Sequence, residues 1–326
     1  MFTIFKFNIR IEQETSPASD ESLLSVWRVL STWIRGIIPA LALLFPLAQP
    51  VIAGENPSGL YDSFQATGDI RRFQDETLYF DIGFLWFDRA ARAKVSFYLK
   101  DGAFHSRLLA QTEGFVGFFT AYRQHIYETE FEIIEDGQRL RAKTFVRRVV
   151  EGDREERTEH RFDYQKRIHS WTDTLNGQAG ERKTESIPQG AHFDDVLTAF
   201  YNFRNGAYGP IEKGAGYTVR TVPEKGQDQI SIQVHTEQEA KKERPLANGV
   251  GNMAYLIDLL VPKELFNTET GRIRLWGSKH LIPMESTIEG YVFLGDLHAT
   301  FRNRTLETLD QVVSSSSTRP VPAAAP

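Results

Sequence analysis

The residue types that most often carry out reactions are present in this sequence, but not at the spacings that a reaction needs. The chain has no cysteine, which excludes disulfides, thiolate metal sites and cysteine nucleophiles. No H-x-H or H-E-x-x-H pattern joins its histidines, so a metal site would have to be assembled from distant strands. No G-x-S-x-G, G-x-G-x-x-G or G-x-x-x-x-G-K-S/T stretch offers a serine nucleophile or a nucleotide-binding loop. The eight histidines are His105, His125, His160, His169, His192, His235, His280 and His298.

Two groups of acidic residues could act as general acids or bases, and a structural role explains both more simply. Asp194 and Asp195 are adjacent, and adjacent residues on a helix point about 100° apart, so they do not face each other. They suit a helix N-terminus, where negative charge is favourable. The row Glu128, Glu130 and Glu132 faces basic residues that neutralise it. The sequence therefore predicts that the protein is not an enzyme, with no catalytic residue, metal or cofactor.

The charge balance also limits the partners. The chain has 38 Lys and Arg against 43 Asp and Glu, a formal net charge of −5. Nucleic-acid binding needs a basic face, so we expect no nucleic-acid partner.

Aromatic residues are the remaining feature with a functional meaning. The chain has 23 Phe, and many lie on predicted apolar faces of strands. One interpretation is the filled core of a β-sandwich or barrel. The other is an apolar cavity in a curved sheet, and for this case we expect Trp86, Phe97, Phe131 and Phe200 to line it and bind an apolar ligand.

The elements that must position these residues are mostly strands, and the clearest of them form a hairpin. Apolar and charged residues alternate on both sides of residues 136–137, an Asp-Gly pair typical of a two-residue turn. Closing the hairpin there sets Phe131 opposite Ala142 on an apolar face and Glu130 opposite Lys143 on a charged face. A slip of one residue would turn the carboxylates toward the core, so the pattern specifies the register.

Similar turns recur along the chain. Residues 101–102 set Leu99 opposite Phe104, and residues 152–153 mark another turn between two alternating segments. Successive hairpins with short turns make an antiparallel meander. The predicted fold class is therefore mostly β, a curved antiparallel sheet or open β-barrel. Further strands are expected at residues 78–87, 216–222, 229–236, 255–261, 271–276, 283–289 and 291–301.

One segment breaks the alternation. Residues 193–203 place apolar side chains at helical spacing, and residues 205–206, an Asn-Gly pair, provide a stop. We expect one short amphipathic helix against the sheet. Its pattern predicts that Phe200 lies on the packed face and that Asn202 faces water.

The first 53 residues are typical of an export signal. The one long apolar run, residues 36–48, has 13 residues, fewer than the roughly 20 of a transmembrane helix. Arg28 and Arg35 precede it, and residues 51–53 place small side chains before a cleavage site. We expect residues 1–53 to be a signal peptide and the protein to be periplasmic. An uncleaved inner-membrane anchor is the alternative, and it would be the protein's one contact with a membrane.

The rest of the chain divides by composition. Residues 54–70 are rich in turn formers and are expected to be an irregular lead-in. Residues 71–304 form a single β-rich domain. Residues 305–326 end in a low-complexity Ser-, Pro- and Ala-rich stretch that is predicted to be a disordered tail.

Three stretches resemble a known family. They are the predicted strand pair 84–99 with the apolar run 114–122, the segment 195–204 with its D-V-L-T-A-F-Y-N-F-R sequence, and residues 275–297, where a Trp precedes Leu-Ile-Pro, a Gly and a Leu. In this order they resemble DUF 3108, a family of exported envelope proteins of Gram-negative bacteria. The resemblance implies a periplasmic, mostly β fold without an established activity, and it supplies no catalytic residue.

Together these observations predict a non-enzymatic periplasmic protein that binds an apolar or lipid-like component of the cell envelope. The alternative is a structural or interaction protein with a filled core and a protein partner in the envelope. An outer-membrane barrel would also have alternating strands, but the separate helix and the Pro- and Ala-rich tail argue against it. The volume of any cavity decides between the first two hypotheses.

Overall fold

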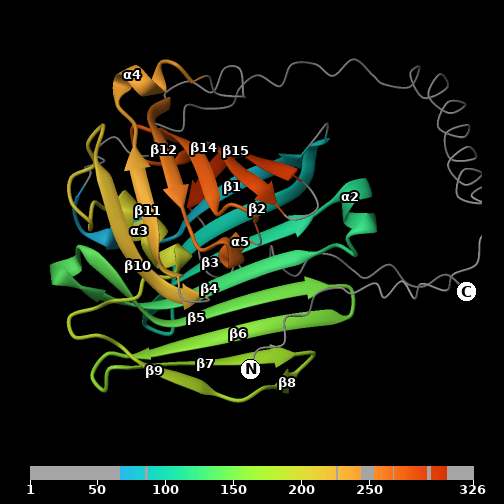
Figure 1. Ribbon diagram of the computed structural model, residues 1–326, viewed down its shortest axis with the longest axis vertical. Helices are drawn as coiled ribbons and strands as arrows, with labels where there is room; N and C mark the ends of the chain where they lie inside the picture. Colours follow the sequence, from blue (N-terminus) through green and yellow to red (C-terminus); the bar gives the residue numbers. More distant parts are fainter. Residues whose placement is uncertain are drawn as a thin grey trace, which may run out of the picture. The chain divides into compact units, whose positions relative to one another are not determined.

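The alternating segments of the sequence pair into one antiparallel sheet of fifteen strands (Figure 1). The computed structural model describes residues 67–84, 87–224, 227–243, 253–266, 268–291 and 295–306. All of them belong to the unit Pro57–Pro326. The predicted signal peptide, nearly all of the predicted lead-in, Trp86 and all but two residues of the predicted tail lie outside these ranges. Among the described residues, no helix is long and apolar enough to cross a membrane.

The strands range from two residues in β8 to 14 in β2, and most neighbours in the sheet are consecutive in the chain. They are β1 (Glu76–Phe84), β2 (Phe87–Lys100), β3 (Ala103–Thr112), β4 (Gln124–Ile134), β5 (Arg139–Glu151), β6 (Arg154–Asp163), β7 (Ile168–Leu175), β8 (Gln178–Ala179), β9 (Lys183–Ser186), β10 (Gly216–Glu224), β11 (Gln227–Val234), β12 (Met253–Leu260), β13 (Arg272–Ser278), β14 (Pro283–Tyr291) and β15 (Gly295–Leu306). The helical elements are η2 (Ile70–Phe73), α2 (Gly114–Phe119), η3 (Glu135–Gly137), α3 (Val196–Arg204), α4 (Glu237–Ala240) and α5 (Lys263–Phe266).

The order of the strands in the sheet joins the two ends of the domain. Strands β10 to β15 follow one another, β15 pairs with β1, and β1 to β8 continue the sheet, with β9 also on β7. Glu76 at the start of β1 lies opposite Leu306 at the end of β15. The path of hydrogen-bonded neighbours ends at β10 and at β8, so the sheet is not closed over the described residues. The prediction of a mostly β, open antiparallel fold is confirmed.

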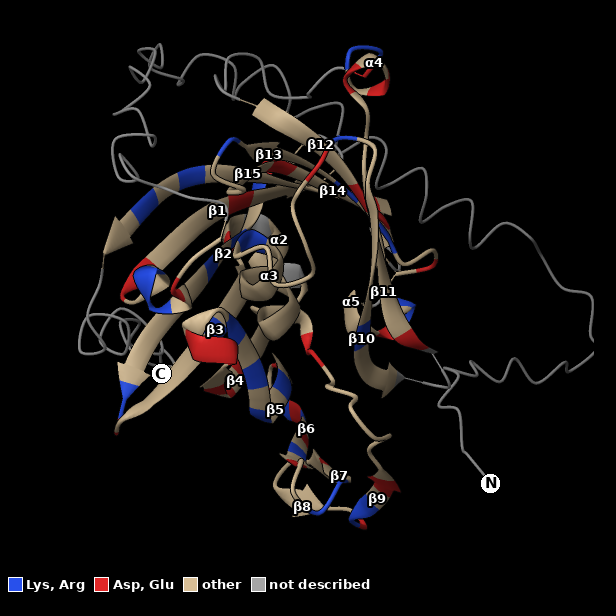
Figure 2. Cartoon of the chain, turned by 90° about the vertical axis from the view of Figure 1, so that its left-hand side faces the viewer, with Lys and Arg blue, Asp and Glu red and all other residues tan. Residues whose placement is uncertain are grey.

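The sheet bends, and α3 lies inside the bend. Figure 2 shows β10 and β11 on one side, β12 to β15 across the top and β3 to β9 descending on the other side. Helix α3 follows β9 and precedes β10 in the chain, so the link between the two sheet edges supplies the element that fills part of the concave side.

The two hairpins predicted in most detail are present. Phe131 lies opposite Ala142, and Leu99 lies opposite Phe104. Asp136 and Gly137 have φ values of 52° and 93°, the left-handed conformations of a type I′ turn. A bulge between Glu130 and Phe131 shifts the pairing, so Glu130 lies opposite Thr144 rather than Lys143. The predicted ion pair of Glu130 with Lys143 is nevertheless formed.

Strands β7 to β9 were not predicted, for a physical reason. They lie at one edge of the sheet, and edge strands keep much of both faces near water. Ile168 and Leu175 of β7 are exposed, while His169 and Ser170 are buried. Strand β7 is paired with β6 on one side and with β8 and β9 on the other, but its residues have no clean alternation of apolar and polar types, so the pattern does not reveal it.

Helix α3 begins at Val196, three residues after the start of the predicted helix 193–203, and it ends at the predicted stop. Asp195 is the N-cap residue, and its side chain accepts hydrogen bonds from the backbone N–H groups of Leu197 and Thr198. The helix ends at Asn205, and the following Gly206 has a φ of 68°. Both acidic residues at the start of the helix are buried.

The orientation of α3 differs from the prediction. Asn202 does not face water: it is fully buried and forms hydrogen bonds with both backbone groups of Leu140 on β5. Phe200 is only partly buried. The helix therefore packs the polar side chain of Asn202 against the backbone of β5. The aromatic side chain of Phe200 lies on a less buried side of the helix. Hydrophobic spacing cannot reveal this, because it takes no account of hydrogen-bond partners on another element.

A buried ion cluster fixes α3 to the middle of the sheet. Glu76 of β1 accepts hydrogen bonds from Arg204 Nη1 at 2.6 Å, from Arg204 Nη2 at 3.1 Å and from Arg304 Nε at 2.7 Å. All three residues are buried. The Arg204 guanidinium also lies 4.5 Å from the ring centroid of Phe73. The cluster links the first strand, the last strand and the helix.

Candidate ligand-binding cavity

The space between α3 and the sheet is an apolar cavity of about 510 Å³. Its volume lies within the roughly 300–1,000 Å³ of small-molecule sites. Residues of both halves of the sheet and of α3 line it. They are Phe80, Ile82, Phe84, Ala90, Ala91, Ala93, Val95, Leu108, Ala110, Gln111, Thr112, Val116, Thr120, Arg123, His125, Tyr127, Val196, Leu197, Ala199, Phe200, Phe203, Arg204, Ile230, Ile232, Ile257, Leu259, Val261, Phe266, Ile273, Leu275, Gly277, Leu281, Pro283, Ser286, Ile288, Tyr291, Leu297 and Ala299.

The cavity exists because small side chains occupy inward positions on strands that flank β1. On β2 and β3, Ala93 lies opposite Ala110. On β14 and β15, Ser286 lies opposite Ala299. Larger residues at these positions would reach toward α3 and fill the space. The cavity thus results from alanine and serine at inward positions where other parts of the sheet have large apolar residues.

The opposite wall is formed by alternate residues of β11 to β13. Ile257 and Leu259 of β12 line the cavity, as do Ile230 and Ile232 of β11. Between the two β12 residues, Asp258 points to the other face of the sheet, as the two-residue period of a strand requires. This wall is aliphatic throughout and offers surface for an apolar guest but no group for chemistry.

Polar side chains gather at one end of the cavity, beside α2. Arg123 precedes β4, and His125 lies two residues further on, so both face the interior. The Tyr291 hydroxyl lies 3.3 Å from His125 Nε2. Thr112 and Thr120 join them, with their hydroxyl oxygens 2.8 Å apart. We call these five residues the polar end.

The polar end is positively charged and open to water. Burial, together with the positive charges of Arg123 and Arg147, lowers the pKa of His125 to about 3, so this ring is neutral at neutral pH. The Arg123 side chain is 30% exposed, and the adjacent Tyr122 is exposed too. The cavity therefore has a dry aliphatic body and one polar end near solvent.

Four other polar residues line the cavity, Gln111, Tyr127, Arg204 and Ser286, and two of them have strong partners. The Tyr127 hydroxyl donates a hydrogen bond to the Leu265 carbonyl at 2.7 Å. Arg204 is held by Glu76. Their polar atoms serve the fold, and their apolar parts contribute to the cavity surface.

The four residues predicted to bind a ligand do not lie together in the structure. Phe200 lines the cavity. Phe97 and Phe131 are buried and stack on each other with ring centroids 5.9 Å apart, in the packed core beside the cavity rather than in its lining. Trp86 lies outside the described residues. The alanines that create the space were not named, since an alanine on a strand carries no chemical signal of its own.

A buried pair of histidines lies away from the cavity. His160 Nδ1 is 3.0 Å from His169 Nε2, and His169 Nδ1 is 2.9 Å from a Glu185 oxygen. Burial and the neighbouring His169 lower the pKa of His160 to about 3. Its ring also stacks on Phe145, with centroids 5.8 Å apart. This arrangement is part of an aromatic core. Over the described ranges, no three His, Asp or Glu side chains are grouped to hold a metal ion.

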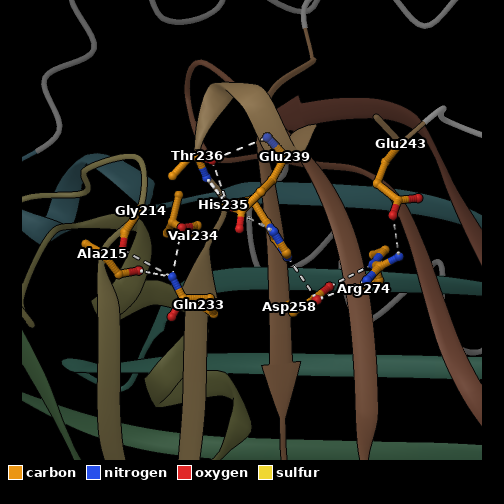
Figure 3. A network of polar contacts seen from close by, with 10 residues as sticks. All are labelled: Gly214, Ala215, Gln233, Val234, His235, Thr236, Glu239, Glu243, Asp258 and Arg274. Atoms are coloured by element: carbon orange, nitrogen blue, oxygen red, sulfur yellow. Dashed lines mark hydrogen bonds and ion pairs between the residues drawn. The ribbon is translucent and has the colours of Figure 1, made fainter. Parts of the chain in front are cut away.

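A second polar network lies on the outer face of β12 and β13 (Figure 3). Asp258 accepts hydrogen bonds from Arg274 Nε at 2.8 Å and Arg274 Nη2 at 3.1 Å, and His235 Nε2 lies 2.9 Å from the same carboxylate. Burial acts to raise the pKa of Asp258, but the hydrogen bonds of Arg274 and His235 outweigh it and lower that pKa. Arg274 also lies 3.5 Å from Glu243. Both carboxylate oxygens are occupied, so the network braces the strands.

The comparisons with known proteins concern the fold. A family model described as "Protein of unknown function (DUF3108)" matches residues 77–288. Among solved structures, the chain is similar to the crystal structure of a beta-barrel-like protein of domain of unknown function DUF1849 from Brucella abortus. The identity is 12% and the TM-score 0.40, over 71% of this chain and 97% of that chain. No curated protein matches this chain in sequence.

Proposed function

The chain belongs to the DUF3108 family, and we propose that it is a non-enzymatic binding protein that holds an apolar or lipid-like molecule in the cavity between α3 and the sheet. The observation that carries this proposal is the cavity itself, about 510 Å³ with an almost entirely apolar lining. Unfilled apolar cavities stay dry and accept apolar guests. Burying a guest's methylene groups contributes about 0.8 kcal/mol each.

The alternative of an interaction protein with a filled core is less well supported. It requires that the aromatic residues and the helix fill the concave side. They fill the part around Phe97 and Phe131, but the neighbouring part, with Ala93, Ala110 and Ala299 in its lining, is left open.

We further propose that the protein acts in the periplasm after export. This rests on the apolar run, the preceding basic residues and the small residues that follow within residues 1–53. Intact mass of the protein recovered from the periplasmic fraction tests it, since cleavage after Ala53 leaves a chain that begins at Gly54.

The binding proposal is tested with a neutral apolar dye. Titration of the protein with N-phenyl-1-naphthylamine should give a saturable fluorescence increase. Ala93→Leu places a larger side chain in the cavity and should weaken dye binding. Ala103→Leu is the matched control, because Ala103 lies at the other end of β3 from the polar end and is not part of the lining.

The outcome that contradicts the proposal is equally specific. Dye binding that does not saturate, or that is equal in wild type and Ala93→Leu, would show that the cavity is not a binding site. In that case the interaction-protein hypothesis becomes the better one.

A further inference from the structure

We infer that the ligand is a single-chain amphiphile with an anionic head group, and that Arg123 binds this head group at the polar end. The inference rests on the proposed function and adds the class of ligand and its direction in the cavity. The acyl chain lies along the aliphatic walls, and the head lies beside α2, where the cavity reaches solvent.

The first support is the state of the Arg123 guanidinium. Its Nε atom is buried and has no hydrogen-bond partner among the described residues. Its nearest carboxylate, that of Glu151, lies 3.8 Å from Nη1 and is about half exposed, so this pair is long and weakened by water. An unsatisfied buried donor on a charged group is costly. An anionic head group would supply the missing acceptor, and charge-assisted bonds to guanidinium are among the strong ones.

The second support is the distribution of polarity within the lining. Thr112, Thr120, His125 and Tyr291 lie with Arg123 at one end, while β11 to β13 contribute only aliphatic residues and Gly277. The charges that act on the buried His125 are those of Arg123 and Arg147, both positive. An amphiphile has the same division into an apolar chain and a polar head, whereas a wholly apolar guest would leave Arg123 Nε without an acceptor.

The third support is size. The cavity volume of about 510 Å³ lies within the roughly 300–1,000 Å³ of sites that bind small molecules. A single-chain amphiphile is a ligand of this size class.

The test measures displacement of bound N-phenyl-1-naphthylamine by three fourteen-carbon compounds, the two anions below their critical micelle concentrations and the alcohol below its solubility limit. Myristate and tetradecyl phosphate carry anionic heads, and 1-tetradecanol is the neutral control with the same chain. Wild type should favour at least one of the anions over the alcohol by roughly tenfold, the effect of about one charge-assisted hydrogen bond. Comparing the two anions tells a carboxylate from a phosphate.

Two variants test whether Arg123 causes the preference for the anions over the alcohol. Arg123→Gln should lose the preference for the anions over the alcohol, measured relative to its own affinity for the dye, and Arg123→Lys should restore part of that preference. Arg148→Gln is the matched control, because Arg148 also lies 3.8 Å from a partly exposed glutamate, Glu155, but does not line the cavity. It should behave as wild type.

The results separate this inference from the proposed function. If wild type binds no dye, the proposed function fails and the inference with it. If wild type binds the dye but the alcohol competes as well as both anions, or if the preference survives in Arg123→Gln, the inference is wrong and the apolar site stands. Should Arg123→Gln fail to fold, the comparison of anion with alcohol on wild type still decides.

Discussion

At the scale of single residues, the most consequential side chains are buried ions. Glu76, Arg204 and Arg304 are each at least 90% buried, and they connect β1, α3 and β15. Removing one partner of such a cluster leaves uncompensated buried charge, which costs far more than a surface ion pair contributes. The segment 195–204, which resembles the family, has a structural role at each end. Asp195 caps α3, and Arg204 binds Glu76 and so holds the helix to the sheet.

We predict that Glu76→Gln lowers the free energy of unfolding by about 3–5 kcal/mol, because both arginines lose their anion. Glu132→Gln is the comparison, since Glu132 pairs with Arg141 at 2.7 Å on the partly exposed charged face of the hairpin; it should cost about 1 kcal/mol or less. Urea unfolding of the two variants measures both values. Similar costs would show that the buried cluster is not structurally important.

His160 should make stability depend on pH. Its pKa is about 3 in the folded protein and near the ordinary 6.5 in the unfolded chain. Between these values the unfolded chain binds a proton that the folded protein does not. The contribution of the neutral His160 ring to the free energy of unfolding is therefore fully present above pH 6.5 and is lost as the pH falls toward 3.

The measurement is urea unfolding of wild type and His160→Gln at several pH values from 7 to 4. The loss of the stacked ring lowers the stability of the variant at every pH, so the slope is the relevant quantity. We expect the stability of wild type to fall more steeply than that of the variant, by up to about 1.4 kcal/mol per pH unit. Parallel curves would contradict the assignment of this pH dependence to His160.

At the scale of elements, turns and caps follow local rules while contacts between elements do not. The Asp136–Gly137 turn has the conformation that its sequence predicts, and Asp195 caps α3 as expected. The face that α3 turns to the sheet is instead decided by Asn202 and the backbone of Leu140.

Gly137 is expected to tolerate a side chain less well than another glycine in a similar turn. Its φ is +93°, and an added Cβ would lie 3.1 Å from Arg71 Nη1 and 3.3 Å from Asp69 Cγ. Gly102 has a φ of +78° with open space around it. Both alanine variants should lose about 1–2 kcal/mol to left-handed backbone strain, and Gly137→Ala should lose more. Equal losses of unfolding free energy in the two variants would show that the contact of the added Cβ with Arg71 does not matter.

At the scale of the whole molecule, the protein divides its interior between a packed region and an empty one. The core around Phe97, Phe131 and Tyr201 is filled, with ring centroids of Phe97 and Tyr201 4.8 Å apart. The neighbouring region is the cavity, which lies between α3, β1 to β4 and β11 to β15. The same sheet thus provides both the stability of the fold and the space for a ligand.

Adding volume should therefore have opposite effects in the two regions. Ala93→Leu extends into the cavity and should leave Tm unchanged or raise it, because each added methylene gains apolar contact. Ala142→Leu adds the same volume at a fully buried position opposite Phe131 and should cost about 1–3 kcal/mol through overpacking. A Tm loss in Ala93→Leu as large as in Ala142→Leu would mean that the cavity cannot accept added volume.

Local patterns in the sequence are sufficient to predict the mostly β fold class, the hairpin turns at residues 101–102 and 136–137 and the acidic cap and C-terminal stop of α3. These features depend on residues within a few positions of each other, so pattern and turn chemistry are sufficient. Local patterns do not predict the pairing of β1 with β15, the buried side of Asn202 or the position of the cavity. Each of these depends on residues far apart in the chain, such as the ion pair of Glu76 with Arg304 or the shared cavity lining of Ala93 and Ala299, which no local pattern records.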